Sequence, residues 1–241
     1  MRTAVGQGFS SAAVCIVCVG VLLPGLMPVR PAARAQQETD RKVEGGGVTV
    51  PGWKGKEDAG NRQGLTVQDS KFAPEGSGFR LVTGPAGLYW SDTNAASGDY
   101  SVKATFTESS QGYTHPHPYG VFIAGQALES GAPTALYCAA YRSGTYIIRG
   151  FSEGKRFDVV AKPAPSDAVK RAASPEAEVV QEVGWNVRGD SLECVVNGTV
   201  VWRGTKADVT GTGRLPSTDG VAGIRVSHNS DALVTGFELT K

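Results

Sequence analysis

The chain has 241 residues, of which 40% are apolar and 20% are charged, and its formal net charge is +1. A chain of this length and apolar content can bury one substantial core. The near-neutral charge argues against nucleic-acid binding, because duplex binding requires a clustered surplus of lysine and arginine, and the sequence has no such cluster. We therefore expect one globular domain without a nucleic-acid partner.

The N-terminal residues have the pattern of an export signal. Arg2 supplies the positive end, residues 12–23 form an apolar run, and residues 33–35 (Ala-Arg-Ala) form an AxA cleavage site. A membrane anchor is the alternative, but the apolar run is shorter than the roughly 20 residues that a spanning helix needs, and Pro24 interrupts it. We predict that residues 1–35 are a signal peptide, that the protein is secreted or periplasmic, and that it leaves the membrane after cleavage.

Two of the four cysteines, Cys15 and Cys18, lie in the predicted signal, so the mature chain keeps Cys138 and Cys194. Both lie in predicted strands among apolar neighbours. In an exported protein this pair is a candidate disulfide. The alternative is two buried thiols that pack as small hydrophobic side chains. The sequence leaves both interpretations open.

Residues 36–60 are polar and rich in glycine, which is typical of a flexible leader or linker, so we place the domain at 61–241. Apolar and polar residues then alternate, which predicts strands at 65–68, at 79–81 and at 88–90. The alternation is clearest over 100–106, where every second residue is apolar and one face of the strand is expected to meet the core.

The next predicted strands are at 119–124, 136–141 and 145–151, and residues 162–177, which contain three prolines, predict a surface excursion. Strands resume at 181–187. The segment WNVRGDSLECVVNGTVVW, residues 185–202, predicts a β-hairpin, because Asn197-Gly198 readily adopts the left-handed dihedrals of a type I′ turn. Strands at 221–226 and 233–239 close the chain.

This order of elements predicts an all-β fold. About a dozen short strands, separated by turn residues and accompanied by hardly any helix, are typical of a two-sheet sandwich or a barrel. No repeat period is present, which disfavours a propeller.

Several segments together carry a family resemblance: the GWKG start, the TGPAGLYW and SGDYSVKATF strands, the 185–202 hairpin and the closing GIRVSHNSDALVTGFEL. They resemble the concanavalin A-like jelly-roll superfamily. Within the superfamily the chain is most similar to laminin G-type modules and to the 3-keto-disaccharide hydrolase-like domains of exported bacterial proteins, over about residues 65–239. The resemblance implies an antiparallel two-sheet jelly-roll sandwich with one concave sheet, whose concave face binds or cleaves glycans.

The candidate ligand-binding residues are the types that sugars require. Aromatic rings stack on the C–H face of a sugar, and planar polar side chains bind its hydroxyls. The candidates on predicted strands or at their ends are Trp90, Tyr119, Tyr141, Arg142, Arg149, His228, Asn229 and Asp231. His115 and His117, in the loop before Tyr119, are candidates as well. Arg142 and Arg149 carry the most weight, because an unpaired charge in or beside an apolar strand is costly. The alternative is that the aromatic rings belong to the core and the arginines face solvent.

The sequence signals for a metal site or a catalytic site are weaker than those for sugar binding. His115, His117 and His228 could bind a transition metal if their segments converge, but no carboxylate or cysteine stands at ligand spacing, so we expect no metal and no cofactor. The ExDxxE type pattern of the glucanases of this superfamily is absent. The sequence therefore favours an exported, lectin-like carbohydrate-binding module. The alternatives are a glycoside-cleaving enzyme of the 3-keto-disaccharide hydrolase type and a structural envelope or protein-interaction module.

Overall fold

The computed structural model describes Thr3 and residues 38–59, 63–109 and 116–241. His115 and, apart from Thr3, the predicted signal peptide lie outside the described residues. The chain divides into two compact units, Met1–Glu38 and Thr39–Lys241, and the fold described below is that of the second unit. Within the described part of the chain, no helix is both long enough and apolar enough to cross a membrane.

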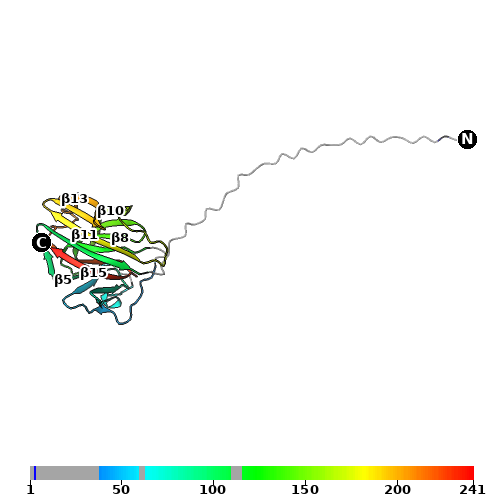
Figure 1. The fold of residues 1–241 in the computed structure, drawn as a ribbon, viewed down its shortest axis with the longest axis horizontal. Coiled ribbons are helices and arrows are strands. Elements are labelled where there is room, and N and C mark those ends of the chain that lie inside the picture. The colour runs from blue at the N-terminus through cyan, green and yellow to red at the C-terminus, as the bar shows by residue number, and fades with distance from the viewer. Residues whose placement is uncertain (1–2, 4–37, 60–62, 110–115) are drawn as a thin grey trace. The chain divides into compact units, whose positions relative to one another are not determined.

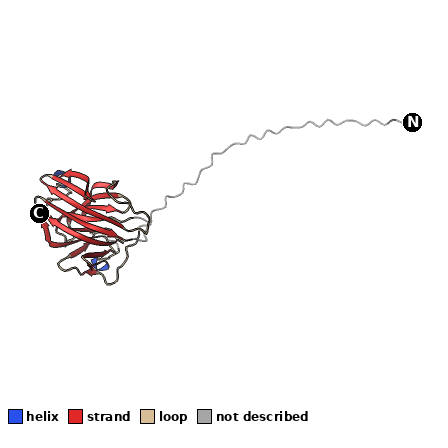
Figure 2. Ribbon diagram, in the orientation of Figure 1, coloured by secondary structure: helices blue, strands red, loops and turns tan. Residues whose placement is uncertain are grey.

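The regular secondary structure of the second unit is almost entirely strand, and the strands form two packed sheets (Figures 1 and 2). The strands of the eight-stranded sheet are, in spatial order, β1 (Gly47–Val48), β3 (Lys71–Glu75), β4 (Gly78–Val82), β15 (Asp231–Thr240), β6 (Tyr100–Glu108), β11 (Val179–Arg188), β12 (Ser191–Val196) and β13 (Thr199–Thr205). The strands of the seven-stranded sheet are β10 (Lys155–Pro165), β9 (Thr145–Ser152), β8 (Thr134–Tyr141), β7 (Tyr119–Gln126), β14 (Gly220–Val226), β5 (Gly87–Ala96) and β2 (Lys54–Glu57). Among the described strands, every pairing is antiparallel except that of β1 with β3. The predicted all-β, two-sheet sandwich is confirmed.

The core lies between the two sheets and follows from the alternation along each strand. In β6 the residues Tyr100, Val102, Ala104 and Phe106 are all buried, as the sequence predicts. Trp185 of β11 is also buried, and its indole nitrogen donates a hydrogen bond to the carbonyl oxygen of Val121 in β7, 3.3 Å away. Because β11 and β7 belong to different sheets, Trp185 joins them by both packing and hydrogen bonding.

A disulfide joins Cys138 of β8 to Cys194 of β12, with their Cα atoms 6.1 Å apart. This resolves the two interpretations that the sequence leaves open. The bond links the two sheets and closes a loop of 56 residues. A loop of that length restricts the unfolded chain enough to contribute about 4 kcal/mol to stability.

The predicted hairpin is confirmed by its turn geometry. Asn197 and Gly198 both have positive φ, 50° and 77°, as a type I′ turn requires, and they connect β12 to β13. The Asn197 side chain does more than permit the turn. Its Oδ1 accepts a hydrogen bond from the backbone of Glu182 (2.9 Å), and its Nδ2 donates to the carbonyl of Ala168 (2.7 Å). The hairpin tip therefore also holds the segment that precedes β11.

The prediction of a strand at 65–68 is wrong, because this segment leads into a short 3-10 helix, η1 (Val67–Asp69). Thr66 caps it by accepting from the backbone of Gln68 (3.2 Å), and Asp69 accepts from the backbone of Thr66 (2.8 Å). Four alternating residues are too few to distinguish a strand from a capped turn. One other helical segment, α1 (Lys206–Val209), follows β13 among the described residues.

The predicted surface excursion at 162–177 begins too early. Its first residues, up to Pro165, belong to the long strand β10. This strand lies at the edge of the seven-stranded sheet, where proline is tolerated because one side of the strand has no ladder partner to satisfy. Pro163 therefore lies within the strand, which ends only at Pro165.

The predicted flexible leader, residues 36–60, contributes two strands. β1 pairs with β3 in the eight-stranded sheet, and β2 pairs with β5 in the seven-stranded sheet. Trp53, between them, packs its ring against Phe72, Phe79 and Phe237 at centroid distances of 5.1–5.4 Å. The glycine-rich composition of residues 36–60 gives no indication that Trp53 packs into the domain. The folded unit begins at Thr39.

Candidate functional site

The outer face of the seven-stranded sheet, directed away from the eight-stranded sheet, carries its own side-chain cluster. Tyr89, Val121, Cys138 and Ile148 of this sheet point into the core, so their neighbours along each strand point outward. These outward residues, with Leu128, form a second apolar cluster: Leu88, Trp90, Phe122, Leu128, Ala135, Tyr137, Ala139, Ile147 and Phe151.

Strand register places one line of residues across all seven strands of this face. Successive cross-strand partners are Lys54, Trp90, Gly223, Phe122, Tyr137, Arg149 and Asp158. We call this line the outer-face row. Directly paired residues in antiparallel strands point to the same face, so their side chains are neighbours. Tyr137 stands beside Arg149 in this line, and Arg149 beside Asp158.

Arg149, one of the two arginines singled out from the sequence, lies on this outer face. Its Nε is 2.8 Å from a carboxylate oxygen of Asp158, and its Nη2 donates to the carbonyl of Ala161 (2.8 Å). The side chains of Arg149 and Asp158 are 22% and 29% exposed, so both groups remain accessible from solvent. The charge of Arg149 in an apolar strand is thus balanced by the neighbouring edge strand.

A second arginine on the outer face, Arg225 of β14, was not predicted. Its guanidinium donates to both carboxylate oxygens of Asp58, at 2.5 and 2.6 Å, and lies over the rings of Tyr137 and Phe151. Burial opposes the charged form of Arg225, but the Asp58 carboxylate outweighs it and raises the arginine's pKa. The signal that singled out Arg149, an arginine inside an apolar strand, was equally present at Arg225.

The predicted aromatic residues of the outer face differ in accessibility. Trp90 is only 2% exposed, and its indole nitrogen donates to Asp92 (3.1 Å), so the ring is not an open platform. It borders a pocket of about 380 Å³ in which Asp92 and Glu129 both pair with Lys54. Tyr141, at the end of β8, is half-buried. Burial raises the pKa of its hydroxyl, against the lowering influence of Arg149 nearby.

Two predicted ligand residues belong to the interior or to loop bracing, which corrects their assignment. Tyr119 is fully buried between the sheets, packs on Phe106, and accepts a hydrogen bond from Gln181 (3.2 Å). The guanidinium of Arg142 donates to the carbonyl oxygens of Pro175 (3.1 Å) and Ala177 (2.5 Å). Tyr119 is therefore a core residue, and Arg142 fixes the segment before β11.

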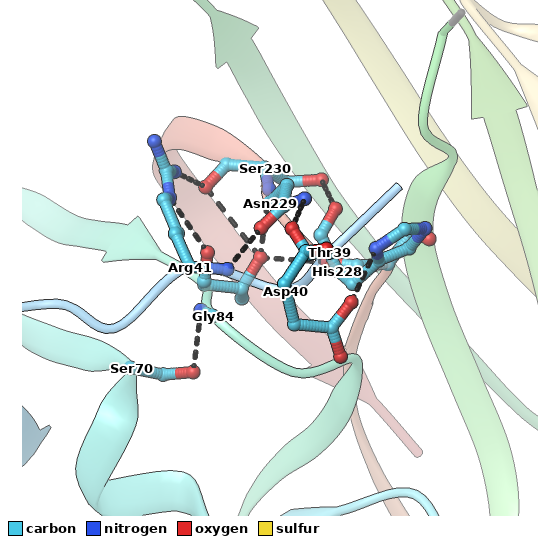
Figure 3. Close-up of polar contacts among 10 residues, drawn as sticks. Thr39, Asp40, Arg41, Ser70, Gly84, His228, Asn229 and Ser230 are labelled. Carbon is cyan, nitrogen blue, oxygen red and sulfur yellow. Dashed lines mark hydrogen bonds and ion pairs between the residues drawn. The ribbon is translucent and has the colours of Figure 1, made fainter. Parts of the chain in front are cut away.

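Asn229, another predicted ligand residue, binds the chain's own N-terminal segment (Figure 3). Its Oδ1 accepts from the backbone nitrogen of Arg41 (2.8 Å), and its Nδ2 donates to the carbonyl of Thr39 (3.1 Å). The Arg41 guanidinium donates in turn to the carbonyls of Thr83 (2.9 Å) and Ser230 (2.6 Å). We call these contacts the N-terminal clamp. They occupy the amide that the sequence assigned to a sugar.

His228 and Asp231, which flank Asn229 in the sequence, also contact side chains of the protein itself. His228 Nδ1 lies 2.7 Å from a carboxylate oxygen of Asp40, and Asp231 pairs with Arg80 at 2.6 Å. His117 is buried, and its ring meets that of His228 edge-on at 4.3 Å between centroids. His115, the third histidine of the metal hypothesis, lies outside the described residues. Within the described ranges, no three His, Cys, Asp or Glu side chains gather as a metal-binding group.

The comparisons with known proteins show the fold. No protein-family model and no curated protein sequence matches this chain. Among solved structures, carbohydrate binding module CBM66 from Bacillus subtilis matches over 80% of this chain and 98% of its own, with TM-score 0.54 and 11% identity. A Bacillus subtilis protein of unknown function with a galectin-like fold matches over 78% and 88%, with TM-score 0.50 and 13% identity. The chain has the concanavalin A-like jelly-roll fold. At such identities the likeness shows the fold alone.

The carboxylates on and beside the outer face of this jelly roll are held by cations. Asp58 pairs with Arg225, Asp158 with Arg149, and Asp92 with Lys54, which lowers the pKa of Asp92. Glycoside hydrolysis by a carboxylate pair requires one acid that stays protonated near neutral pH. The described carboxyl group with a raised pKa, about 7, is Glu108, and it is buried at the inward-facing end of β6 beside Tyr119.

Proposed function

We propose that the protein binds carbohydrate on the outer face of its seven-stranded sheet. The site lies at the end of the outer-face row that holds Arg149, and it includes Tyr141, which lies outside the row at the end of β8. The observation that carries the proposal is the fixed pairing of Arg149 with Asp158 beside Tyr137. A guanidinium and a carboxylate held next to aromatic rings provide a donor, an acceptor and an apolar surface, which are the groups that a sugar uses.

Both Arg149 and Tyr141 have hydrogen-bonding capacity to spare. Arg149 forms an ion pair with Asp158 through Nε and donates a hydrogen bond from Nη2 to the carbonyl of Ala161, and its Nη1 has no hydrogen-bond partner among the described residues. The hydroxyl of Tyr141 likewise has none in the described part of the chain, and this side chain is half-buried. A polar group in such a position is weakly hydrated and gains from a ligand hydroxyl.

We also propose that the protein acts outside the cytoplasm. The predicted signal peptide and the Cys138–Cys194 disulfide support this location, because structural disulfides form and persist in oxidising compartments. Glycans of cell walls and surfaces are found there, so the location fits a carbohydrate ligand.

A glycan array tests the proposal, with four purified proteins compared at equal concentration. They are the wild type, Tyr141→Ala, Arg149→Ala and the matched control, Arg188→Ala. Arg188 is exposed at the end of β11, in the other sheet, where its guanidinium donates to the carbonyl of Val187. We expect the wild type and the control to retain the same glycans, and the two outer-face variants to lose at least about tenfold in affinity.

Thermal melts of all four proteins establish that the variants are folded. Equal retention by Tyr141→Ala and Arg149→Ala would contradict the outer-face site, and retention of no glycan would contradict carbohydrate binding. Product analysis on each retained sugar separates binding from turnover. Released product would favour the glycoside-cleaving alternative.

A further inference from the structure

Two pockets that share Arg214 lie where the β9–β10 turn and the edge strands approach the segment after α1. The first, which we call the end pocket, has a volume of about 540 Å³ and is lined by Thr134, Ser152, Glu153, Lys155, Arg156, Gly211, Thr212, Gly213, Arg214 and Pro216. The second, the edge pocket, has a volume of about 330 Å³ and is lined by Asp158, Val159, Trp202, Arg203, Asp208 and Arg214. Both volumes fall in the range of small-molecule sites.

The end pocket is strongly cationic. Lys155, Arg156 and Arg214 line it, against one carboxylate, Glu153. Lys155 is exposed and makes no ion pair with any described residue. The Nε of Arg156 lies 3.4 Å from a carboxylate oxygen of Asp158, but the Arg156 side chain is 56% exposed. A pocket with this surplus of cations favours an anionic group.

Arg214 is held in place and still has donors to offer. Its Nη1 donates to the carbonyl of Asp208 (2.6 Å), and its guanidinium lies over the ring of Phe157 at 5.6 Å. Nε and Nη2 make no hydrogen bond within the part of the chain that the structure describes. A guanidinium fixed in this way can bind a carboxylate through two parallel hydrogen bonds at little entropic cost.

The edge pocket combines balanced charge with an aromatic ring. Asp158 and Asp208 oppose Arg203 and Arg214, and Trp202 is half-buried among them. The indole is fixed on one side, because a Cβ added at Gly204 would lie 2.3 Å from its ring atoms. An indole that borders a pocket offers its apolar surface to an uncharged sugar ring.

We propose that the two adjoining pockets bind an acidic polysaccharide, with a uronate carboxylate in the end pocket and an uncharged sugar ring against Trp202 in the edge pocket. A nucleic acid fits less well, because it carries a phosphate at every nucleotide and would place one against Asp158 and Asp208. A polymer that alternates acidic and neutral residues matches the change of charge between the pockets. The edge pocket shares Asp158 with the outer-face site, but Arg149 and Tyr141 line neither pocket, and the end pocket contains none of the three residues.

Affinity measurements on the full protein with four probes test this inference. The probes are hyaluronan oligosaccharides, which alternate uronate and uncharged hexosamine, polygalacturonate oligosaccharides, dextran and single-stranded DNA. We expect hyaluronan to bind most tightly, and its affinity to fall as sodium chloride is raised. Tighter binding of DNA or dextran would overturn the inference. Tighter binding of polygalacturonate would overturn the assignment of a neutral ring to the edge pocket, and binding of no probe would overturn the whole inference.

Four variants locate the site. Arg214→Gln and Lys155→Gln should each weaken hyaluronan binding at least about tenfold, because each removes a charged donor from the end pocket. Lys155 has no ion pair to lose among the described residues, so Lys155→Gln also serves if Arg214→Gln folds poorly. Lys162→Gln, on the same strand but outside both pockets, is the matched control. Unchanged affinity in Lys155→Gln would overturn the inference. Tyr141→Ala should keep hyaluronan binding, which separates a failure here from a failure of the outer-face proposal.

Discussion

Arg149 of β9 and Asp158 of β10 form an ion pair of 2.8 Å at one end of the outer-face row. The pair connects the outermost strand of the sheet to its neighbour and limits the orientations of the guanidinium. Both side chains are partly exposed, and such surface pairs contribute about 1 kcal/mol or less to stability. The main effect of the pair is therefore to fix the position of Arg149, and the pair contributes little to the stability of the fold.

Replacement of Asp158 should separate the positioning of Arg149 from the stability of the fold. In Asp158→Asn the carboxylate is lost, and we expect neutral-glycan affinity to fall several-fold because Arg149 is no longer held. The free energy of unfolding should change by about 1 kcal/mol or less. Calorimetric titration and chemical denaturation measure the two quantities. Arg203→Gln alters the edge pocket but not the row, so it is the control, and equal losses in both variants would contradict the role of the pair.

Loss of the disulfide should destabilise the sandwich. Replacement of both Cys138 and Cys194 by alanine reopens a 56-residue loop in the unfolded chain, so the free energy of unfolding should fall by about 4 kcal/mol. Denaturation of the wild type with and without a reductant measures the same effect independently. The double variant should not respond to the reductant. A variant as stable as the oxidised wild type would contradict a structural role for the bond.

Burial raises the pKa of Glu108 to about 7 from an ordinary value of 4.5, although Arg142 and the Tyr119 hydroxyl oppose the shift. Between these two values the folded protein binds more protons than the unfolded chain. The contribution of Glu108 to stability is therefore complete below about pH 4.5 and is lost as pH rises through 7. Denaturation at a series of pH values should show stability falling over this window, and Glu108→Gln should remove most of the fall. An identical pH profile in the variant would contradict the assignment.

The N-terminal clamp makes its own contribution to the stability of the fold. Asn229 has a positive φ of 53°, so Asn229→Gly removes the amide without straining the backbone. Two hydrogen bonds to residues 39–41 are lost, and the free energy of unfolding should fall by about 1–3 kcal/mol. Limited proteolysis should cut near Arg41 earlier than in the wild type. Asn186→Ala, which removes a surface contact to Glu193, is the control. Equal protection in both variants would show that Asn229 does not hold the segment.

The sequence predicted the two-sheet fold because alternation and turn chemistry are local signals. The β6 pattern and the Asn197-Gly198 turn depend on residues within a few positions of one another. The role of Asn229 could not be found in this way, because its partner Arg41 lies 188 positions away in the chain. Asparagine bound to a backbone and asparagine bound to a sugar look identical in sequence.

The residues that the sequence proposes for a ligand site do not share one face. Arg149 and Tyr141 lie on the outer face, whereas Tyr119 faces inward. Tyr119 alternates with Gly120, and single-residue register decides which of them meets the core. The 119–124 run is apolar on both faces, so the pattern gave no indication of which face was which. Arg225 carries the same sequence signal as Arg149, because it too lies inside an apolar strand.

The most direct test of the central claim is the location of a bound neutral glycan by NMR. Backbone amide resonances of the labelled protein would be followed as a glycan retained on the array is titrated in. The account predicts that the largest shifts fall on β8, β9 and the part of β10 near Asp158. Shifts confined to the eight-stranded sheet, with β8 and β9 unaffected, would contradict the proposal that the outer face of the seven-stranded sheet binds carbohydrate.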